Sequence, residues 1–189
     1  VMGTTNLLES IKNTKSIKSA IIVTTDKVYL KLEKKHKFKE SAKLGGFDLY
    51  SSSKAACDMI AESYIKSFFS KKNCGVAIVR SGNCIGGGDW TKDRIVKDCA
   101  EAFAKNRKLI IRSPNATRPW QHVLDPLFGY LKLAKKIFDN KRYNGPWNFG
   151  PNKKNNLKEK KLAIIGKKIF NSNSKILLKK KKFYESENL

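Results

Sequence analysis

The sequence predicts an α/β protein built around a parallel β-sheet, and three features carry this prediction. Short apolar runs alternate with longer stretches in which apolar residues recur at helical spacing, an order typical of strands joined by crossover helices. The runs are continuously apolar, as expected for strands that helices cover on both faces. Hydroxyl and charged residues follow the runs directly, at the edge where open α/β sheets bind ligands.

The first half of the chain predicts two strands and two helices in alternation. Apolar residues at helical spacing indicate a helix over residues 5–14. Residues 19–25 form a short apolar run that ends in hydroxyl side chains, which indicates a buried parallel strand. Over residues 50–69 apolar positions recur every four residues, which predicts a long amphipathic helix. Residues 74–80 predict a second buried strand.

The second half continues with shorter elements. The glycine-rich stretch 81–89 predicts a loop, and the apolar positions between 95 and 103 indicate a helix. Short strands are expected at residues 109–112 and 147–150. A helix over 157–170 and a lysine-rich strand or tail after it complete the predicted order.

A further helix begins at Asp125 and Pro126, because an acidic residue followed by proline suits a first helical turn. Its apolar residues predict one buried stripe, made of Leu127, Tyr130, Leu131, Ala134 and Phe138.

The composition is strongly basic, with 40 Lys and Arg against 16 Asp and Glu and a formal net charge of +24. Such an excess can serve nucleic-acid binding, because cations that neutralise phosphates release counterions. The lysines are spread along the whole chain, and no zinc-finger or RNP-type motif accompanies them. We interpret the charge as a solvated basic surface that suits an anionic small molecule, and we expect no nucleic-acid partner. The densest runs lie at 34–35, 153–154, 167–168 and 179–182.

Two absences narrow the class of protein further. No run of about 18 apolar residues is present, and the first residues lack the basic-then-apolar order of a secretory signal, so we expect no membrane association. The four cysteines stand far apart without a CxxC pair, which favours thiols in a reducing cytoplasm over disulfides or a metal site.

Tyr50 and Lys54 are the most informative pair for chemistry. At the start of a helix, positions i and i+4 share one face, so the phenol and the ammonium group lie side by side. A nearby ammonium favours the phenolate form, which lets the phenol act as a base. The spacing alone is common by chance. Its place, after a strand that ends in Thr25, Asp26 and Lys27, points to a site at the carboxyl edge of the sheet.

These residues resemble the extended short-chain dehydrogenase/reductase family, in particular its nucleotide-sugar dehydratases and the branch that acts on CDP-glucose. The Tyr-x-x-x-Lys helix stands in the family's order between the two strands, and the resemblance extends from about residue 3 to residue 151. It implies a Rossmann-like, doubly wound parallel sheet with NAD as cofactor. Segments that carry the likeness are 23–29, 45–48, 81–90, 118–124 and 147–151.

The resemblance implies a reaction in three steps: oxidation at C4 of the sugar, loss of water across C5 and C6, and hydride return to C6. It makes Tyr50 the base for the C4 hydroxyl, with Thr25 holding the C4 oxygen. Asp26 would protonate the departing C6 hydroxyl. Lys27 stands where many related dehydratases carry a glutamate, and a lysine there marks the CDP-glucose branch. Lys54 would contact the nicotinamide ribose.

Binding residues follow from the same resemblance. Thr24 and Ser81 join Tyr50 and Lys54 as expected cofactor contacts. A nucleotide sugar such as CDP-glucose is the expected partner, and a homodimer or higher homo-oligomer the expected assembly. The residues expected to bind the substrate's diphosphate or nucleotide are Asn83, Arg94, Arg112 and Arg118.

The resemblance also predicts how the chain is divided. Residues 1–80 and 120–150 would be the remainder of the NAD-binding core, and residues 81–119 and 151–189 the substrate-binding part. No Gly-x-x-Gly-x-x-Gly dinucleotide fingerprint occurs in the sequence, so we expect the amino-terminal half of the fold to precede Val1 and this segment alone to be inactive.

Two alternative functions stay open: another nucleotide-sugar epimerase or dehydratase, and a basic nucleic-acid-binding protein.

Overall fold

The computed structural model describes residues 1–30, 38–70, 74–151 and 156–179. By its internal contacts the chain divides into two compact units. The first unit consists of residues 1–82 and 124–150, and the second of residues 83–123 and 151–189. The expected roles of such units in cofactor and substrate binding stay predictions.

Three of the basic runs lie wholly or largely outside the described residues, namely 34–35, 153–154 and 179–182.

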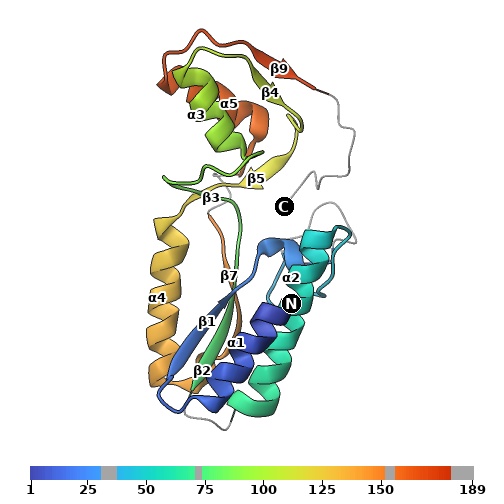
Figure 1. Cartoon of the computed structure of the whole chain (residues 1–189), viewed down its shortest axis with the longest axis vertical. Coiled ribbons are helices and arrows are strands. Elements are labelled where there is room, and N and C mark those ends of the chain that lie inside the picture. Colours follow the sequence, from blue (N-terminus) through green and yellow to red (C-terminus); the bar gives the residue numbers. More distant parts are fainter. Residues whose placement is uncertain (31–37, 71–73, 152–155, 180–189) are drawn as a thin grey trace. The chain divides into compact units, whose positions relative to one another are not determined.

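The first unit is built on a parallel sheet of three strands in the order β1–β2–β7, which confirms the predicted parallel arrangement (Figure 1). Ile22 pairs with Ile78 between β1 and β2, and Val79 pairs with Trp147 between β2 and β7. All three strands therefore end at the same edge of the sheet. Their bounds are Ser19–Val23 for β1, Gly75–Ser81 for β2 and Gly145–Phe149 for β7.

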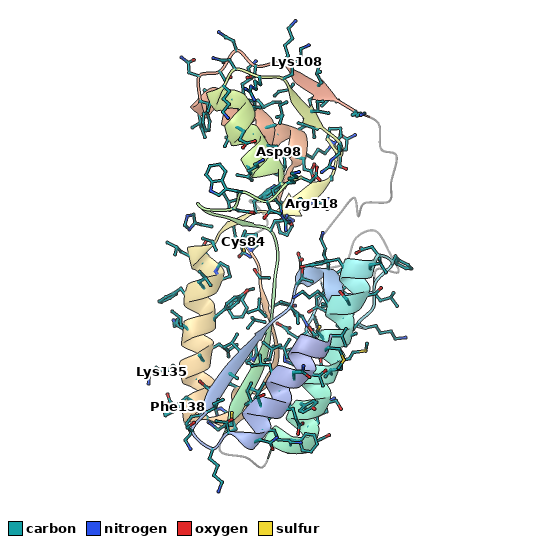
Figure 2. The ribbon with its side chains drawn as sticks, in the orientation of Figure 1. Cys84, Asp98, Lys108, Arg118, Lys135 and Phe138 are labelled. Atoms are coloured by element: carbon teal, nitrogen blue, oxygen red, sulfur yellow. The ribbon has the colours of Figure 1, made fainter. Side chains whose placement is uncertain are left out.

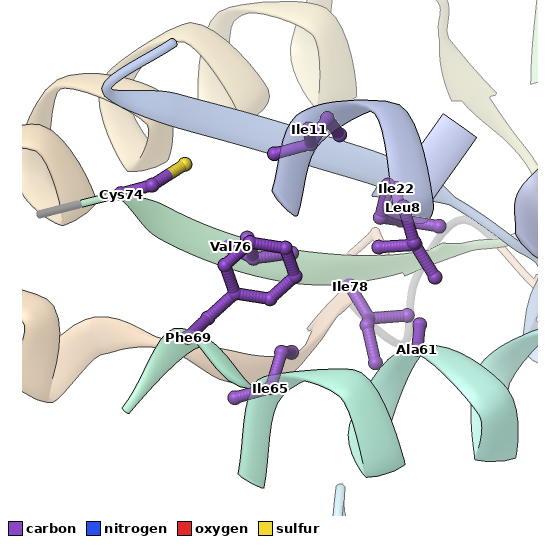
Figure 3. Close-up of a cluster of buried hydrophobic side chains, with 9 residues drawn as sticks. All are labelled: Leu8, Ile11, Ile22, Ala61, Ile65, Phe69, Cys74, Val76 and Ile78. Atoms are coloured by element: carbon purple, nitrogen blue, oxygen red, sulfur yellow. The ribbon is translucent and has the colours of Figure 1, made fainter. Parts of the chain in front are cut away.

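The central strand β2 is buried on both faces, and its alternate residues belong to two different cores. Val76 and Ile78 pack with side chains from α1 (Met2–Asn13) and α2 (Leu49–Tyr64), as Figure 3 shows. Ala77 and Val79 pack with α4 (Leu124–Asp139). Helices thus cover both faces of the sheet, and each buried valine or isoleucine side chain contributes about 1.5–3 kcal/mol through removal from water.

The long helix that the sequence predicts over 50–69 is confirmed in two parts. The α-helical part is α2, and it continues into a π-helical turn over Ile65–Phe69. Phe69, at the end of this turn, is fully buried beneath the sheet.

The helix predicted after residue 124 is confirmed, but its predicted buried stripe is only partly right: Tyr130 is partly buried against the sheet core, whereas other members of the stripe are exposed. Leu131 is 72% exposed and Phe138 is 56% exposed, whereas Leu133 and Ile137 are buried against the sheet (Figure 2 labels Phe138). The helix carries apolar residues on more than one side, so periodicity alone could not select the face that meets the sheet.

The second unit combines two helices with pairs of very short strands. The helices α3 (Ile95–Ala104) and α5 (Glu159–Ile169) pack together around Phe103, which is 2% exposed. Strand β4 (Leu109–Ile111) runs parallel to β9 (Ile176–Leu178), which confirms the predicted strand at 109–112 and shows a strand after α5.

Four strands of the second unit were not predicted. Each is two or three residues long, too short for alternation or a continuous apolar run to be recognised. The strand β3 pairs in parallel with β6, and β5 pairs in antiparallel with β8; their bounds are Cys84–Ile85, Gln121–His122, Thr117–Pro119 and Asn156–Lys158.

All four cysteines carry thiols, as the sequence predicts: Cys57, Cys74 and Cys99 are buried and Cys84 is exposed.

Among the helices of the described part, none is long and apolar enough to cross a membrane.

The end of α4 approaches the start of β2 so closely that a side chain at Gly75 has no room. A Cβ atom there would lie 2.4 Å from the backbone oxygen of Ile137. We expect Gly75→Ala to lower the free energy of unfolding by about 1–3 kcal/mol, because backbone must shift to admit the methyl group. Urea denaturation followed by circular dichroism measures this change.

Gly87→Ala is the matched control, since no atom lies within 4 Å of a Cβ at that position. Equal stability of the two variants would contradict the close packing of α4 on the sheet.

Candidate active site

The carboxyl edge of the sheet is shaped first by Thr24, the residue after β1. Its backbone N–H donates to the oxygen of Val79 at 2.9 Å, which extends the ladder between β1 and β2. Its hydroxyl donates to Asp58 Oδ2 of α2, also at 2.9 Å. Thr24 is 7% exposed, so these bonds fix where the chain leaves the sheet.

A 3₁₀ turn over Asp26–Val28 follows, and Thr25 caps it. The Thr25 hydroxyl accepts from the backbone N–H of Lys27 at 3.4 Å and donates to Asp26 Oδ1 at 3.2 Å. Capping by a side-chain oxygen satisfies an amide that the short turn leaves unpaired. The turn therefore presents Thr25, Asp26 and Lys27 together.

The start of α2 is held by Asp48 and by a close glycine contact. Asp48 Oδ1 accepts from the backbone N–H of Ser51 at 2.9 Å, and Oδ2 accepts from its hydroxyl at 2.7 Å. Burial acts to raise the pKa of Asp48, but these hydrogen bonds outweigh it and lower the pKa below its usual value. A Cβ at Gly46 would lie 2.5 Å from Ser51 Cβ, so the loop passes tightly over the first turn.

Tyr50 stands in this first turn and is 51% exposed, with Lys54 one turn further along the same helix. The ammonium group of Lys27 lies 5.6 Å from the centre of the Tyr50 ring, within the range of a cation–π contact. The end of β1 and the start of α2 are thus brought together as the sequence predicts. The result is a solvent-accessible phenol with the ammonium group of Lys27 nearby.

Ser81, the last residue of β2, pairs in register with Phe149 of β7 and is partly buried at the same sheet edge. Ser81 is the last of the predicted site residues that belong to the first unit.

The predicted substrate-binding residues belong to the second unit. The backbone oxygen of Asn83 accepts from Gln121 N at 3.0 Å. Arg94 Nε lies 3.9 Å from Asp89, and Arg112 Nη1 lies 2.9 Å from Asp93. Both arginines are exposed, and ion pairs of this kind contribute only about 0–1 kcal/mol, so an anionic ligand can displace the carboxylates.

Arg118 differs from these two arginines. It lies on β5, is 5% exposed, and its Nε is 3.4 Å from a carboxylate oxygen of Glu159 at the start of α5 (Figure 2). The structure thus places Arg118 in a buried ion pair, apart from the ion pairs that Arg94 and Arg112 form with the 89–93 segment.

One part of the site was missed from the sequence. Arg80 of β2 and Asp58 of α2 are both fully buried and form a two-bond ion pair behind Thr24. The signal that could have revealed them is a charged residue within an otherwise apolar strand, since a buried charge needs a buried partner. Within the described ranges no group of His, Cys, Asp and Glu is arranged to hold a metal ion.

Comparison with known proteins identifies relatives over most of the chain. A family model described as GDP-mannose 4,6 dehydratase matches residues 1–184. The CDP-glucose 4,6-dehydratase of Salmonella typhimurium is 43% identical over 157 residues, which are 80% of this chain and 44% of that protein. The dTDP-D-glucose 4,6-dehydratase of Homo sapiens is 29% identical over 147 residues, 77% of this chain and 40% of that protein.

Among solved structures, dTDP-glucose 4,6-dehydratase from Bacillus anthracis in complex with NAD matches with a TM-score of 0.80 and 26% identity. The match covers 100% of this chain and 57% of that one. It confirms a Rossmann-like α/β fold. The chain spans less than half the length of the curated relatives.

The cap at Asp48 generates a prediction about the start of α2. Asp48→Ala removes the acceptor for two hydrogen bonds from Ser51 and should lower the free energy of unfolding by about 1 kcal/mol at pH 7. Asp48→Asn keeps an oxygen acceptor and should lose less. Urea denaturation of the three proteins measures the difference.

The same variants test the sign of the pH dependence. Because the pKa of Asp48 is lowered by folding, its carboxylate stabilises the fold above the unfolded-state pKa of about 4 and ceases to do so as pH falls through the lower folded value. The gap between parent and Asp48→Ala should narrow over that acidic range. A gap that widens there would contradict the assignment.

Proposed function

The chain belongs to the GDP-mannose 4,6 dehydratase family, and from that premise we propose that its gene product is an NAD-dependent nucleotide-sugar 4,6-dehydratase that acts on CDP-glucose. The substrate is suggested by the relative from Salmonella typhimurium, which is 43% identical. The observation that best supports this reaction type is that Lys27 lies close to the Tyr50 ring. This contact shows that the turn after β1 and the start of α2 are adjacent.

In this proposal Tyr50 removes the proton of the C4 hydroxyl. Its phenol is accessible at the start of α2, as a base that meets a bound sugar must be. Thr25 holds the C4 oxygen, and Lys54 contacts the nicotinamide ribose. NAD, when bound, supplies the chemistry of hydride uptake from C4 and hydride return to C6.

The two residues after Thr25 serve the loss of water. The new C4 ketone acidifies C5, so the C5 proton is lost as the C6 hydroxyl departs, and we assign its acceptor to a water molecule that Lys27 orients. We assign protonation of that hydroxyl to Asp26 in its carboxylic-acid form, whose Oδ1 lies 3.2 Å from the Thr25 hydroxyl oxygen. Lys27 orients the leaving group or a water molecule, since an ammonium group is a base only when its charge is strongly disfavoured.

The residues proposed for the cofactor fit this task unequally. Tyr50 and Lys54 stand in the first two turns of α2 and Ser81 ends β2, and we propose that they contact the cofactor at the carboxyl edge of the sheet, where open α/β sheets bind nucleotides. The hydroxyl of Thr24 does not fit a cofactor contact, because it is buried and already donates to Asp58. Its contribution is to fix the backbone.

The substrate's diphosphate suits the planar guanidinium groups of Arg94 and Arg112, which are exposed and held only by surface carboxylates. Asn83 offers an amide for the nucleotide. Arg118 is compensated by Glu159, so we propose that it shapes the wall of the nucleotide site.

Turnover by the complete gene product tests the proposal. Purified protein with NAD should convert CDP-glucose to its 4-keto-6-deoxy derivative, followed by mass spectrometry as the loss of one water. Tyr50→Phe removes the proposed base and should lower kcat by roughly a hundredfold. Tyr64→Phe is the matched control on the same helix, since Tyr64 bonds to Glu9 of α1.

Three outcomes would count against the proposal. Turnover of dTDP-glucose or GDP-mannose in place of CDP-glucose would overturn the substrate. Equal kcat for Tyr50→Phe and Tyr64→Phe would overturn the role of Tyr50. Salt-dependent DNA binding without turnover of any nucleotide sugar would favour the nucleic-acid alternative.

The division of labour between Asp26 and Lys27 is tested separately. Asp26→Asn should spare the oxidation at C4 while blocking water loss, so reduced nicotinamide absorbance builds up with little product. Lys27→Met should slow elimination and the exchange of the C5 proton with solvent deuterium, while the oxidation step stays largely intact. If both variants lose oxidation as severely as Tyr50→Phe, the two residues only hold the shape of the site.

A further inference from the structure

We propose that Arg80 and Asp58 form an internal clamp that positions turn 25–27 against Tyr50; this inference rests on the function proposed above. Arg80 is 1% exposed and Asp58 is 0% exposed. Arg80 Nε donates to Asp58 Oδ2 at 2.9 Å and Nη2 donates to Oδ1 at 2.5 Å. This two-bond geometry fixes the direction as well as the distance between β2 and α2.

The remaining donors of Arg80 hold the segment after the turn. Nη1 donates to the hydroxyl of Tyr29 at 3.0 Å and to the backbone oxygen of Glu40 at 2.8 Å. Nη2 also donates to Glu62 Oε1 of α2 at 3.0 Å. Burial lowers the pKa of the guanidinium, but the hydrogen bonds to Asp58 and Tyr29 more than offset it and raise the pKa overall, so the charge persists.

Tyr29 links Arg80 to strand β7 through hydrogen bonds. Its hydroxyl donates to Asn148 Oδ1 at 2.5 Å while accepting from Arg80. Burial raises the pKa of Tyr29, which keeps the phenol protonated and able to donate. The Asn148 side-chain amide in turn donates to the backbone oxygen of Phe38 at 3.0 Å, and Phe38 stacks on the Tyr29 ring at 4.8 Å.

The turn is therefore fastened on both sides by one ion pair. On the side of β1, Thr24 donates to Asp58; on the other side, Tyr29 accepts from Arg80. Residues 25–27 lie between these two points, and the same Asp58 belongs to the helix that carries Tyr50. A displacement of either partner moves the turn relative to the phenol, and a misplacement of about 1 Å can cost a hundredfold in rate.

This role goes beyond stability, and the energetics of buried ion pairs make the two separable. Removing Arg80 alone leaves the buried Asp58 carboxylate without its cation, which costs about 3–5 kcal/mol, whereas removing Asp58 leaves Arg80 with Glu62 as its carboxylate partner. Replacing both partners by apolar residues of similar volume is often neutral. Such a replacement keeps the packing between β2 and α2 but removes the hydrogen bond from Thr24 to Asp58 and the one from Arg80 to Tyr29.

The test uses the complete gene product with the paired replacement Arg80→Met and Asp58→Leu. We expect a thermal midpoint within about 5 °C of the parent. We expect kcat to fall by at least tenfold while KM for CDP-glucose changes by less than about threefold, because the turn acts on the reacting atoms. Amide hydrogen exchange in residues 24–30 should quicken, with α1 unchanged.

The matched control is the paired replacement Lys97→Met and Glu101→Leu, which removes an ion pair of 2.9 Å on α3 and should change neither kcat nor exchange in 24–30. Tyr29→Phe, which keeps the ring stack with Phe38, should also quicken that exchange and lower kcat; it decides the matter if the paired replacement does not fold.

Unchanged exchange and unchanged kcat in a folded Arg80/Asp58 replacement would overturn the clamp. A parent that turns over no nucleotide sugar would instead overturn the proposed function, and the exchange measurement would still decide whether the clamp holds the turn.

Discussion

β2 is covered by helices on both faces, and this double burial is the constraint on which the rest of the first unit depends. Val76 and Ile78 contribute to the core under α1 and α2, while Ala77 and Val79 contribute to the core under α4. Because successive side chains of a strand point to opposite faces, a shift of one residue in register would exchange the two cores. Any polar side chain on this strand must satisfy its hydrogen bonds inside the protein.

The site is a consequence of that arrangement. Parallel strands all end at the same edge of the sheet. Residues that follow different strands, although far apart in the sequence, therefore lie close together at that edge. The backbone leaves β1 through a 3₁₀ turn, and α2 begins at a capped first turn, which leaves Lys27 facing the ring of Tyr50. The rigid sheet and helix carry the reactive groups, and the buried polar residues behind them set the angle between these elements.

Sequence patterns predicted the parts of this fold that are long or locally encoded. The strand at 19–25 and the helix at 50–69 carry enough residues for their periodicity to be unambiguous, and the Tyr50–Lys54 spacing is a property of one helical turn. The face of α4 could be predicted only in part, because its apolar residues lie on more than one side of the helix and only the sheet selects among them. The charge of Arg80 within an apolar strand is visible in the sequence, but its partner Asp58 was not, since it lies 22 residues away.

The ion pair between Arg80 and Asp58 has a consequence for how this chain can change over generations. A substitution of Arg80 alone leaves the buried Asp58 carboxylate without its cation, and a substitution of Asp58 alone leaves Arg80 only Glu62, so we expect selection to disfavour single changes at either position. We therefore expect the two codons to be exchanged together or kept together. Homologous genes should therefore either keep both residues or replace both, whichever nucleotide sugar the encoded enzyme prefers.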